Sequence, residues 1–248
     1  MRKVLLVTGA SRGIGAATAL LAASQGWAIA VNYVVNAQAA DAVVAQIKAQ
    51  GGTAVAVQAD VSLEDDVLRL YQTVDSQLGR ITGLVNNAGV VDMPAKLVDM
   101  SVARWERQWV MNITSSFLCA REAVKRMSTR LGGAGGVIVN LSSAAARIGS
   151  PGQYLDYAAS KGAIDTFTMG LAKEVALEGI RVNAVRPGII DTDIHASGGM
   201  PDRVTQMAPM VPLQRAGSAQ EVAQAIVWLL SDASSYTTGA IVDVTGGR

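Results

Sequence analysis

The sequence has 248 residues, of which 50% are apolar and 17% are charged. Because about 25% of residues are charged in an average globular chain, this composition excludes a disordered, highly solvated protein. The 21 Lys and Arg residues nearly balance the 20 Asp and Glu residues, which leaves no basic excess for nucleic acid or an anionic membrane. The length fits one large domain or two small ones. Since no linker interrupts the pattern, we expect residues 1–248 to form a single domain.

The chain contains one cysteine, Cys119, and one histidine, His195. Together they cannot form a disulfide or a His/Cys zinc site, so we predict no bound metal. The first apolar run is too short for a signal peptide, and no apolar stretch reaches the roughly 18 residues of a membrane span. We therefore expect a cytoplasmic protein with no membrane partner.

Short β-branched runs alternate with longer segments of helical spacing along the chain. The expected strands are Val4–Thr8, Ala28–Tyr33, Ala54–Gln58, Gly83–Asn87, Val137–Leu141, Arg181–Arg186 and Ala240–Val244. The expected helices are about Gly13–Gln25, Ala37–Gln50, Leu63–Leu78, Val102–Thr129, Leu155–Glu178 and Ala219–Ser231. This alternation predicts βαβ units, and the nearly continuous apolar character of the strands predicts a parallel sheet covered by helices on both faces.

Local signals support several of these helix boundaries. Ser218 and Glu221 fit a capping box, and Ser62 and Ser101 are expected N-caps. Glycines suited to the left-handed residue that ends a helix stand at Gly26, Gly51, Gly79 and Gly179.

The first expected strand leads into a glycine-rich turn, Gly9-x-x-x-Gly13-x-Gly15, which opens the first helix. Glycines permit a tight turn, and the backbone N–H groups at a helix start favour a pyrophosphate. A position between strand and helix is the context expected of a dinucleotide site. The alternative is a tight turn without a ligand.

The end of the second strand indicates which dinucleotide is bound. An NAD site usually has an acidic residue there to hold the adenosine ribose, but this chain has Asn32–Tyr33 and no acid before Asp41. Arg12 places a cation in the turn, where a 2′-phosphate can lie, and the missing carboxylate removes a repulsion. We predict that NADP(H) is preferred and that NAD(H) is possible.

Tyr157 and Lys161 lie four residues apart at the start of a helical segment, so their side chains share one face. A free tyrosine has a pKa near 10, too high for efficient proton transfer at neutral pH. A neighbouring ammonium group favours the phenolate and so lowers this pKa. Tyr154 has Ala158 at the matching position and lacks the cation. The alternative for Tyr157 and Lys161 is an ordinary surface pair.

Residues 191–212 lack a clear period and contain Gly198–Gly199 and several prolines. Long loops inside compact domains are often lids over a binding site. We predict that this segment closes over the substrate.

The motifs, taken together and in order, resemble those of the short-chain dehydrogenase/reductase family. They are the turn from Thr8 to Gly15, Asn86-Asn87-Ala88-Gly89, Tyr157-x-x-x-Lys161 and Pro187-Gly188. The resemblance covers essentially the whole chain. It implies a doubly wound, Rossmann-type α/β fold, a three-layer sandwich with a seven-stranded, mainly parallel sheet in the order 3-2-1-4-5-6-7.

The resemblance also assigns roles to individual residues. It implies that Tyr157 is the general acid or base, that Ser143 donates a hydrogen bond to the substrate oxygen, and that Lys161 also holds the nicotinamide ribose. Asn112 matches the position that holds a proton-relaying water. The residues expected at the cofactor, besides Tyr157 and Lys161, are Gly9, Ser11, Arg12, Gly13, Ile14, Gly15, Asn32, Tyr33, Asp60, Val61, Asn87, Ala88, Gly89, Pro187, Gly188, Ile190 and Thr192. Asp60 is equally well explained as an acid that begins a helix.

One departure from the family concerns the loop Ala144–Gln153. Ser143 precedes Tyr157 by 14 residues, about one more than the family leads us to expect. This loop is therefore slightly enlarged, and the family motifs do not determine the shape of the pocket. Arg147 and Asp156 flank the segment, and we expect both on the surface.

The predicted function is the NADP(H)-dependent interconversion of a carbonyl and an alcohol by hydride transfer. The partner is then a small carbonyl or alcohol compound, and the stretch from Tyr154 to Asp165 resembles bacterial members of the family described as sugar- or polyol-dehydrogenase-like. The resemblance implies a homotetramer formed through the two long helices. The alternatives are a dinucleotide-binding redox sensor without turnover and a methyltransferase on a similar fold, for which the Tyr157 and Lys161 pair would be idle.

Overall fold

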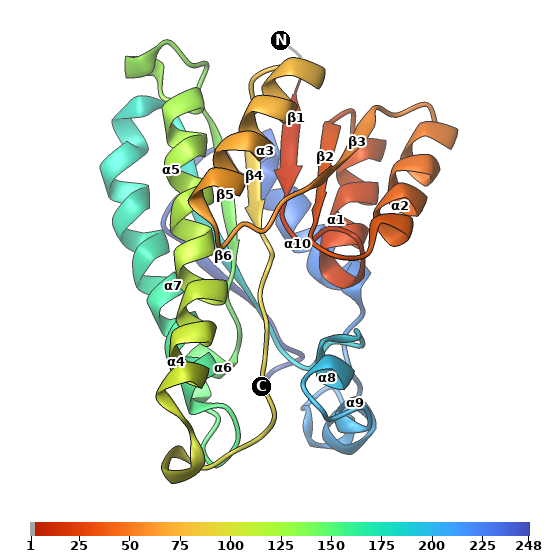
Figure 1. The fold of residues 1–248 in the computed structure, drawn as a ribbon, viewed down its shortest axis with the longest axis vertical. Helices are drawn as coiled ribbons and strands as arrows, with labels where there is room; N and C mark the ends of the chain where they lie inside the picture. Colours follow the sequence, from red (N-terminus) through yellow and green to blue (C-terminus); the bar gives the residue numbers. More distant parts are fainter. Residues whose placement is uncertain (1–2) are drawn as a thin grey trace.

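The computed structural model describes residues 3–248, the side chain of His195 excepted. Within these residues a seven-stranded sheet has the order β3-β2-β1-β4-β5-β6-β7, and each neighbouring pair is parallel (Figure 1). The strands are β1 (Val4–Val7), β2 (Ala28–Tyr33), β3 (Ala54–Gln58), β4 (Gly83–Asn86), β5 (Gly136–Leu141), β6 (Ile180–Pro187) and β7 (Ile241–Val244). The strand order and the parallel pairing predicted from the sequence are confirmed.

Helices connect the strands and cover the sheet. They are α1 (Gly13–Ser24), α2 (Ala37–Ala49), α3 (Glu64–Gln77), α4 (Val102–Trp109), α5 (Ser115–Met127), α6 (Ala145–Ile148), α7 (Leu155–Val175), α8 (Ile194–Ser197), α9 (Arg203–Met207) and α10 (Ala219–Leu230). A π-helical turn, Val110–Thr114, joins α4 to α5. Single 3₁₀ turns lie at Leu97–Asp99, Thr129–Leu131, Ala176–Glu178, Ala208–Met210 and Asp232–Ser234.

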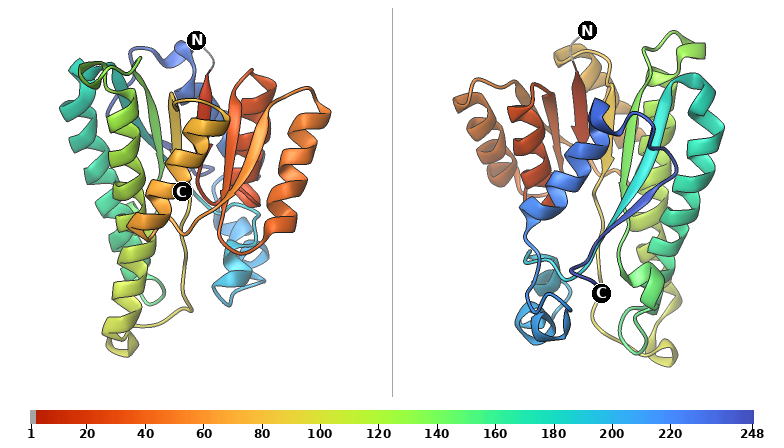
Figure 2. Two further views of the ribbon diagram at one scale, coloured as in Figure 1. Left: turned by 45° about the horizontal axis from the view of Figure 1, so that its top comes forward. Right: turned by 180° about the vertical axis from the view of Figure 1, so that it is seen from behind.

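Alternate side chains of the strands enter two separate apolar cores. Leu5 and Val7 of β1 pack with α1, α2 and α10, whereas Val4 and Leu6 pack with α3, α5 and α7. This alternation follows from the two-residue period of a strand. Because both faces are covered, the strands are apolar on both sides, and the molecule is the expected three-layer sandwich (Figure 2).

The helix predicted over Val102–Thr129 is found as a continuous helical run that ends at Met127, but the sequence did not indicate the π-helical turn within it. The π-helical turn inserts an extra residue into the spiral and contains the buried Asn112. The amide of Asn112 bonds to the backbone of Val90 and to Ser160, which lie outside this helix. These distant partners stabilise the irregular turn, and apolar spacing does not report them.

Most helix-end signals agree with the structure. Ser218 and Glu221 form the capping box, Ser101 caps α4, and the four glycines expected at helix ends all have positive φ. Ser62 is not an N-cap, because α3 begins one residue later than the sequence indicated. Its N–H and hydroxyl instead donate to Asp60.

Several short elements gather beyond the carboxyl ends of the strands. In Figure 1, α8 and α9 lie on one side of this edge and α4 and α6 on the other, with the end of the chain between them. The segment 191–212 contains α8, α9 and a 3₁₀ turn. It is therefore more regular than its lack of a clear sequence period indicated. Among the described residues, we find no helix with the length and apolarity needed to cross a bilayer.

Candidate active site

The glycine turn joins β1 to α1 at the carboxyl edge of the sheet. Gly9 and Gly13 have φ values of +60° and +56°, a region that favours glycine. A Cβ added at Gly15 would lie 2.6 Å from both the side-chain nitrogen of Asn87 and the carbonyl oxygen of Gly9. The turn therefore needs glycine for two reasons, backbone conformation and lack of space.

Two asparagine side chains are hydrogen-bonded to the backbone of this turn. Asn87 Nδ2 donates to the carbonyl oxygens of Thr8 at 2.8 Å and Gly9 at 3.0 Å. Asn32 Oδ1 accepts from the N–H of Gly9 at 3.2 Å, and its Nδ2 donates to the carbonyl of Ala59 at 2.9 Å. Asn32 is 1% exposed, so its side chain is occupied by the protein's own backbone.

The other residues expected at the adenosine end also make contacts within the protein. Asp60 Oδ1 accepts from the N–H and hydroxyl of Ser62, and Asp60 lies in the turn that precedes α3 rather than at the first residue of that helix. The side chain of Val61 packs in the apolar core. Arg12 is exposed and donates to Ser197 Oγ at 3.3 Å, with Asp193 Oδ2 at 3.8 Å. Arg12 thus bridges the glycine turn and α8.

One cavity brings together the two ends of the predicted site. From the glycine turn and β4 it is lined by Ile14, Asn87 and Gly89, and from the predicted catalytic set by Ser143, Tyr157 and Lys161. The segment after β6 contributes Pro187, Gly188, Ile190 and Thr192. Residues predicted for the cofactor that do not line this cavity are Gly9, Ser11, Arg12, Gly13, Gly15, Asn32, Tyr33, Asp60, Val61 and Ala88.

Ser143 and Tyr157 lie close together in the cavity. Ser143 follows β5, and its Oγ accepts from the N–H of Ala145 at 3.1 Å. Burial raises the pKa of Tyr157 above its ordinary value, and a hydrogen bond with Ser143 offsets only part of this rise, so the lowered pKa expected from the sequence is not found here. The Nζ of Lys161 is 5.7 Å from the centroid of the Tyr157 ring. The two side chains therefore share one face of α7, as their spacing predicted.

Lys161 is 4% exposed, and its ammonium donates to the carbonyl oxygen of Leu141 at 2.7 Å. Burial lowers the pKa of Lys161 to about 8, while the charge of Asp165 acts to raise it. The group is therefore close to half protonated in mildly alkaline solution. Ser142 fixes the backbone of this helix turn, since its hydroxyl donates to the carbonyl of Lys161 at 3.2 Å.

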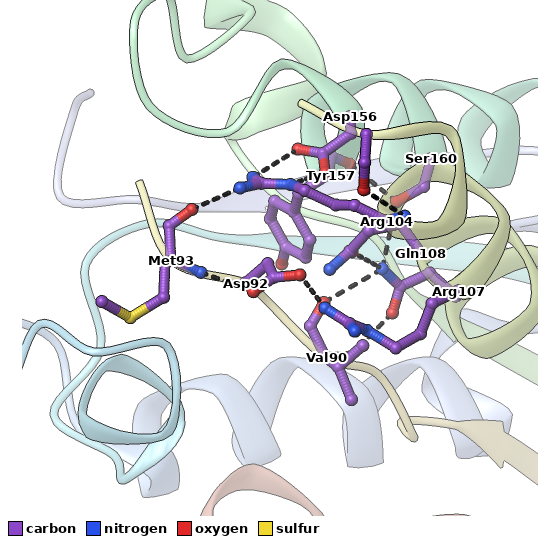
Figure 3. A network of polar contacts seen from close by, with 11 residues as sticks. Val90, Asp92, Met93, Arg104, Arg107, Gln108, Asp156, Tyr157 and Ser160 are labelled. Atoms are coloured by element: carbon purple, nitrogen blue, oxygen red, sulfur yellow. Dashed lines mark hydrogen bonds and ion pairs between the residues drawn. The ribbon is translucent and has the colours of Figure 1, made fainter. Parts of the chain in front are cut away.

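Asn112 is fully buried beside the same lysine (Figure 3 shows the surrounding network). Its Oδ1 accepts from the N–H of Val90 at 2.8 Å, and its Nδ2 donates to Gln108 Oε1 at 2.7 Å. A Cβ added at Gly89 would lie 3.0 Å from Asn112 Oδ1 and 3.5 Å from Lys161 Nζ. The two polar groups thus converge beside Gly89, where an added Cβ would be in tight contact with Asn112.

Figure 3 also shows an ion pair that sequence analysis missed. Arg104 of α4 holds Asp156 with two hydrogen bonds, of 2.6 and 3.1 Å, and donates to the carbonyl of Met93 at 2.6 Å. Asp156 is buried, so the prediction that it lies on the surface is wrong. The pair fixes the residue next to Tyr157 to α4. Its members are 52 residues apart, and no local pattern relates them.

The loop Ala144–Gln153 forms the short helix α6 and then contains three left-handed residues, Gly149, Ser150 and Gly152, with φ values of +71°, +45° and +71°. Ile148 and Ser150 line the cavity. Arg147 is exposed and pairs with Asp243.

The glycine turn on a parallel sheet, with a serine, a tyrosine and a lysine in the adjoining cavity, defines the class of the protein. The chain belongs to the short-chain dehydrogenase/reductase family and is an oxidoreductase. Residues 9–248 match the sequence model of a family described as "Enoyl-(Acyl carrier protein) reductase".

Individual relatives support this assignment over the full length of the chain. An "Uncharacterized oxidoreductase YgfF" of Escherichia coli is 54% identical over 99% of both chains. A 3-oxoacyl-[acyl-carrier-protein] reductase of Synechocystis is 43% identical, covering 99% of this chain and 96% of the relative. A crystal structure of a short-chain type dehydrogenase/reductase from Mycobacterium marinum is 35% identical, with a TM-score of 0.92, covering 99% of this chain and 94% of that one.

Proposed function

We propose that this oxidoreductase interconverts a carbonyl and an alcohol with NADP(H) as the hydride carrier and Tyr157 as the general acid or base. The observation that carries the proposal is that Ser143, Tyr157 and Lys161 line one cavity, which continues to the glycine turn. Hydroxyl, phenol and ammonium groups at one place are the groups that proton transfer at a carbonyl oxygen requires.

The glycine turn and the cavity fit a dinucleotide. A Cβ at Gly13 would project to within 3.5 Å of Thr192, into the space between the turn and the segment after β6. The turn opens the twelve-residue helix α1, whose N-terminus favours phosphate. We assign the pyrophosphate to the turn, and the nicotinamide to the walls formed by Gly89, Pro187 and Gly188. A nicotinamide bound there supplies or accepts a hydride at the substrate carbon.

In the reductive direction, Tyr157 donates its phenolic proton to the substrate oxygen, and the carbonyl becomes an alcohol. Ser143 donates a hydrogen bond to the same oxygen and stabilises the developing negative charge. The ammonium of Lys161 stabilises the phenolate that remains, because opposite charges attract more strongly in a buried site. Asn112 is bonded to the backbone of Val90 and lies beside Lys161. It can hold the water through which a proton returns to Lys161. Oxidation reverses each step.

The preference for NADP(H) is supported by the lack of an acidic side chain at the end of β2, residues 33–36, and by the cation of Arg12. This end carries Tyr33 and two partly or fully exposed valines, Val34 and Val35, in place of an acid. Asn36 is occupied as the N-cap of α2. Arg12 is exposed and able to leave Ser197 and Asp193 for a phosphate, because its ion pair is long and solvated.

The remaining predictions extend this proposal. The segment 191–212 acts as a substrate lid within one domain of residues 1–248, the protein is a cytoplasmic homotetramer, and the partner is a small carbonyl or alcohol compound. The redox-sensor alternative requires cofactor binding without turnover. Relatives named as 3-oxoacyl-[acyl-carrier-protein] reductases favour turnover, and they favour carbonyl reduction.

A spectrophotometric screen at ~340 nm tests the proposal, with NADPH and NADH against ketones, aldehydes, sugars and polyols, because hydride transfer removes the reduced-nicotinamide absorbance. We expect turnover with a higher kcat/KM for NADPH. Tyr157→Phe should lower kcat at least about a hundredfold while NADPH still binds, since general acid–base groups contribute that much. Turnover by this variant near the wild-type rate would remove Tyr157 from its role. NADPH binding without any turnover would favour the sensor.

A further inference from the structure

Two arginines enter the active-site cavity from the segments that follow β6 and β7. Arg203 begins α9, Arg248 lies after β7, and both line the cavity that contains Ser143 and Tyr157. Figures 1 and 2 show the end of the chain between the α8 and α9 side and the α4 and α6 side of this edge. Their charges therefore face the space proposed for the substrate.

Arg203 is held firmly by the loop that joins Ser143 to Tyr157. The residue is 8% exposed, and its Nη1 donates to Gln153 Oε1 at 2.8 Å. Its guanidinium carbon lies 4.9 Å from the centroid of the Tyr154 ring. A neutral amide and an aromatic face thus orient the guanidinium group of Arg203, and some of its N–H donors remain available for a ligand.

Arg248 is positioned by the backbone of the segments that precede it. The N–H of Gly188 donates to the carbonyl of Val244 at 2.9 Å, and the N–H of Leu213 donates to the carbonyl of Gly246 at 3.1 Å. The pKa of Arg248 is lowered, first by burial and then by the positive charge of Arg203. Both residues line the same cavity, so the two positive charges face one space.

Other partly buried arginines are satisfied in two ways: Arg181 donates to Ser234 and to backbone carbonyls, and three others hold a carboxylate. Arg104, Arg126 and Arg186 pair with acidic side chains at 2.6 to 2.7 Å. Over residues 3–248 no ion pair joins Arg203 or Arg248 to a carboxylate. Arg203 is buried and Arg248 is partly buried, and two like charges that line one cavity without a counter-charge disfavour each other. An anion between them would satisfy both.

On the basis of the proposed function, we infer that Arg203 and Arg248 bind an oxyanion of the substrate, a carboxylate or a phosphate, at the end away from the reacting carbonyl. Guanidinium groups bind such oxyanions through paired hydrogen bonds. The substrate class is thus a small oxo compound with an anionic end.

The proposed function assigns the phosphates of the cofactor to the glycine turn, which Thr192 approaches at Gly13, and so leaves this arginine pair for another anion. Arg203 is held instead by Gln153 and Tyr154, on the loop between the proposed catalytic Ser143 and Tyr157.

The test compares charged and neutral members of two matched substrate pairs with NADPH. The pairs are 3-oxobutanoate with its methyl ester, and dihydroxyacetone phosphate with dihydroxyacetone. We expect kcat/KM to favour the anionic member at least tenfold in one pair. The pair that shows the preference distinguishes a carboxylate from a phosphate.

Variants connect the preference to the two arginines. Arg203→Gln should lower the anionic-to-neutral ratio at least tenfold, and Arg248→Gln at least threefold. Arg248→Gln keeps the test decisive if Arg203→Gln does not fold, because Arg248 has no role in holding the loop after Ser143. The matched control is Arg130→Gln, which removes the same charge from an exposed side chain paired with Glu178. It should leave the ratio within twofold.

A binding measurement makes the result independent of turnover. The melting temperature of the wild type should rise with malonate or inorganic phosphate, and the rise should disappear in a protein carrying both glutamine substitutions. No rise with either anion, or equal use of both members in both pairs, would overturn the oxyanion site and leave carbonyl reduction intact. A rise without turnover of any carbonyl would support the oxyanion site and contradict the proposed function.

Discussion

Individual buried polar side chains decide whether the active site keeps its shape. The amide of Asn87 joins β4 to the glycine turn, and Thr8 Oγ1 accepts from the N–H groups of Asn87 and Ala88 at 3.0 and 2.9 Å. Each of these groups would be unsatisfied without its partner, and an unsatisfied buried group costs about 1–3 kcal/mol. The turn is thus organised before a cofactor arrives.

Asn87→Ala removes the two hydrogen bonds that Asn87 Nδ2 donates to the carbonyl oxygens of Thr8 and Gly9, and it leaves these oxygens without that donor. We expect a loss of about 2 kcal/mol in unfolding free energy and weaker binding of NADPH. Urea unfolding and fluorescence titration with NADPH measure both effects. Gln58→Ala is the control, because it removes one exposed bond to the carbonyl of Val34. Equal effects of the two substitutions would contradict the role of Asn87.

Lys161 should make stability depend on pH in a defined direction. Burial lowers its pKa from the ordinary 10.5 to about 8. Between these values the unfolded chain holds the proton and the folded chain does not, so stability rises as the pH rises. Relative to Lys161→Met, the wild type should gain about 2 kcal/mol between pH 7.5 and 10, since one pKa unit corresponds to about 1.4 kcal/mol. Paired denaturant titrations at the two pH values measure the gain, and a flat or falling difference would contradict the shift.

At the scale of elements, the sequence predicts regular structure well and its interruptions poorly. The βαβ alternation determines the sheet because each strand carries its own apolar run, and Ser218 with Glu221 marks α10 locally. The π-helical turn around Asn112 depends on bonds to Val90 and Ser160, which a pattern of apolar residues does not encode.

The same distinction applies to the site. Tyr157 and Lys161 are predictable because one helical turn separates them, and the glycine turn is predictable because its residues are consecutive. The Arg104 and Asp156 pair and the position of Arg203 depend on how separate elements pack. Local spacing carries no signal of either.

The Arg104 and Asp156 pair fastens α4 to the start of α7. The two side chains are 10% and 1% exposed, so Asp156→Asn leaves a mostly buried guanidinium without its counter-charge. Breaking a buried pair in this way costs about 3–5 kcal/mol, which urea unfolding would show. Glu64→Gln breaks the exposed pair with Arg121 and should cost less than about 1 kcal/mol. A similar small loss for both variants would mean that the buried pair is not essential to this junction.

At the scale of the whole molecule, one apolar surface is left uncovered by residues 3–248. Phe117 of α5 and Phe167 of α7 stack with their ring centroids 3.9 Å apart, beside a groove lined also by Leu118, Val124 and Leu171. Phe117 is 46% exposed. Contiguous apolar surface of this kind often marks a contact between subunits, and these two helices are the ones expected to join the proposed homotetramer.

Phe117→Arg should therefore shift the assembly to smaller species. In a two-fold symmetric contact one substitution appears twice, so two guanidinium groups would face each other across an apolar surface and repel. Sedimentation velocity should show a tetramer for the wild type and a dimer or monomer for the variant. Val35→Arg is the control, because Val35 is 87% exposed and follows β2, which lies on the other side of the sheet from α5 and α7 (Figure 1). A tetramer that survives Phe117→Arg would place the subunit contact on another face of the molecule.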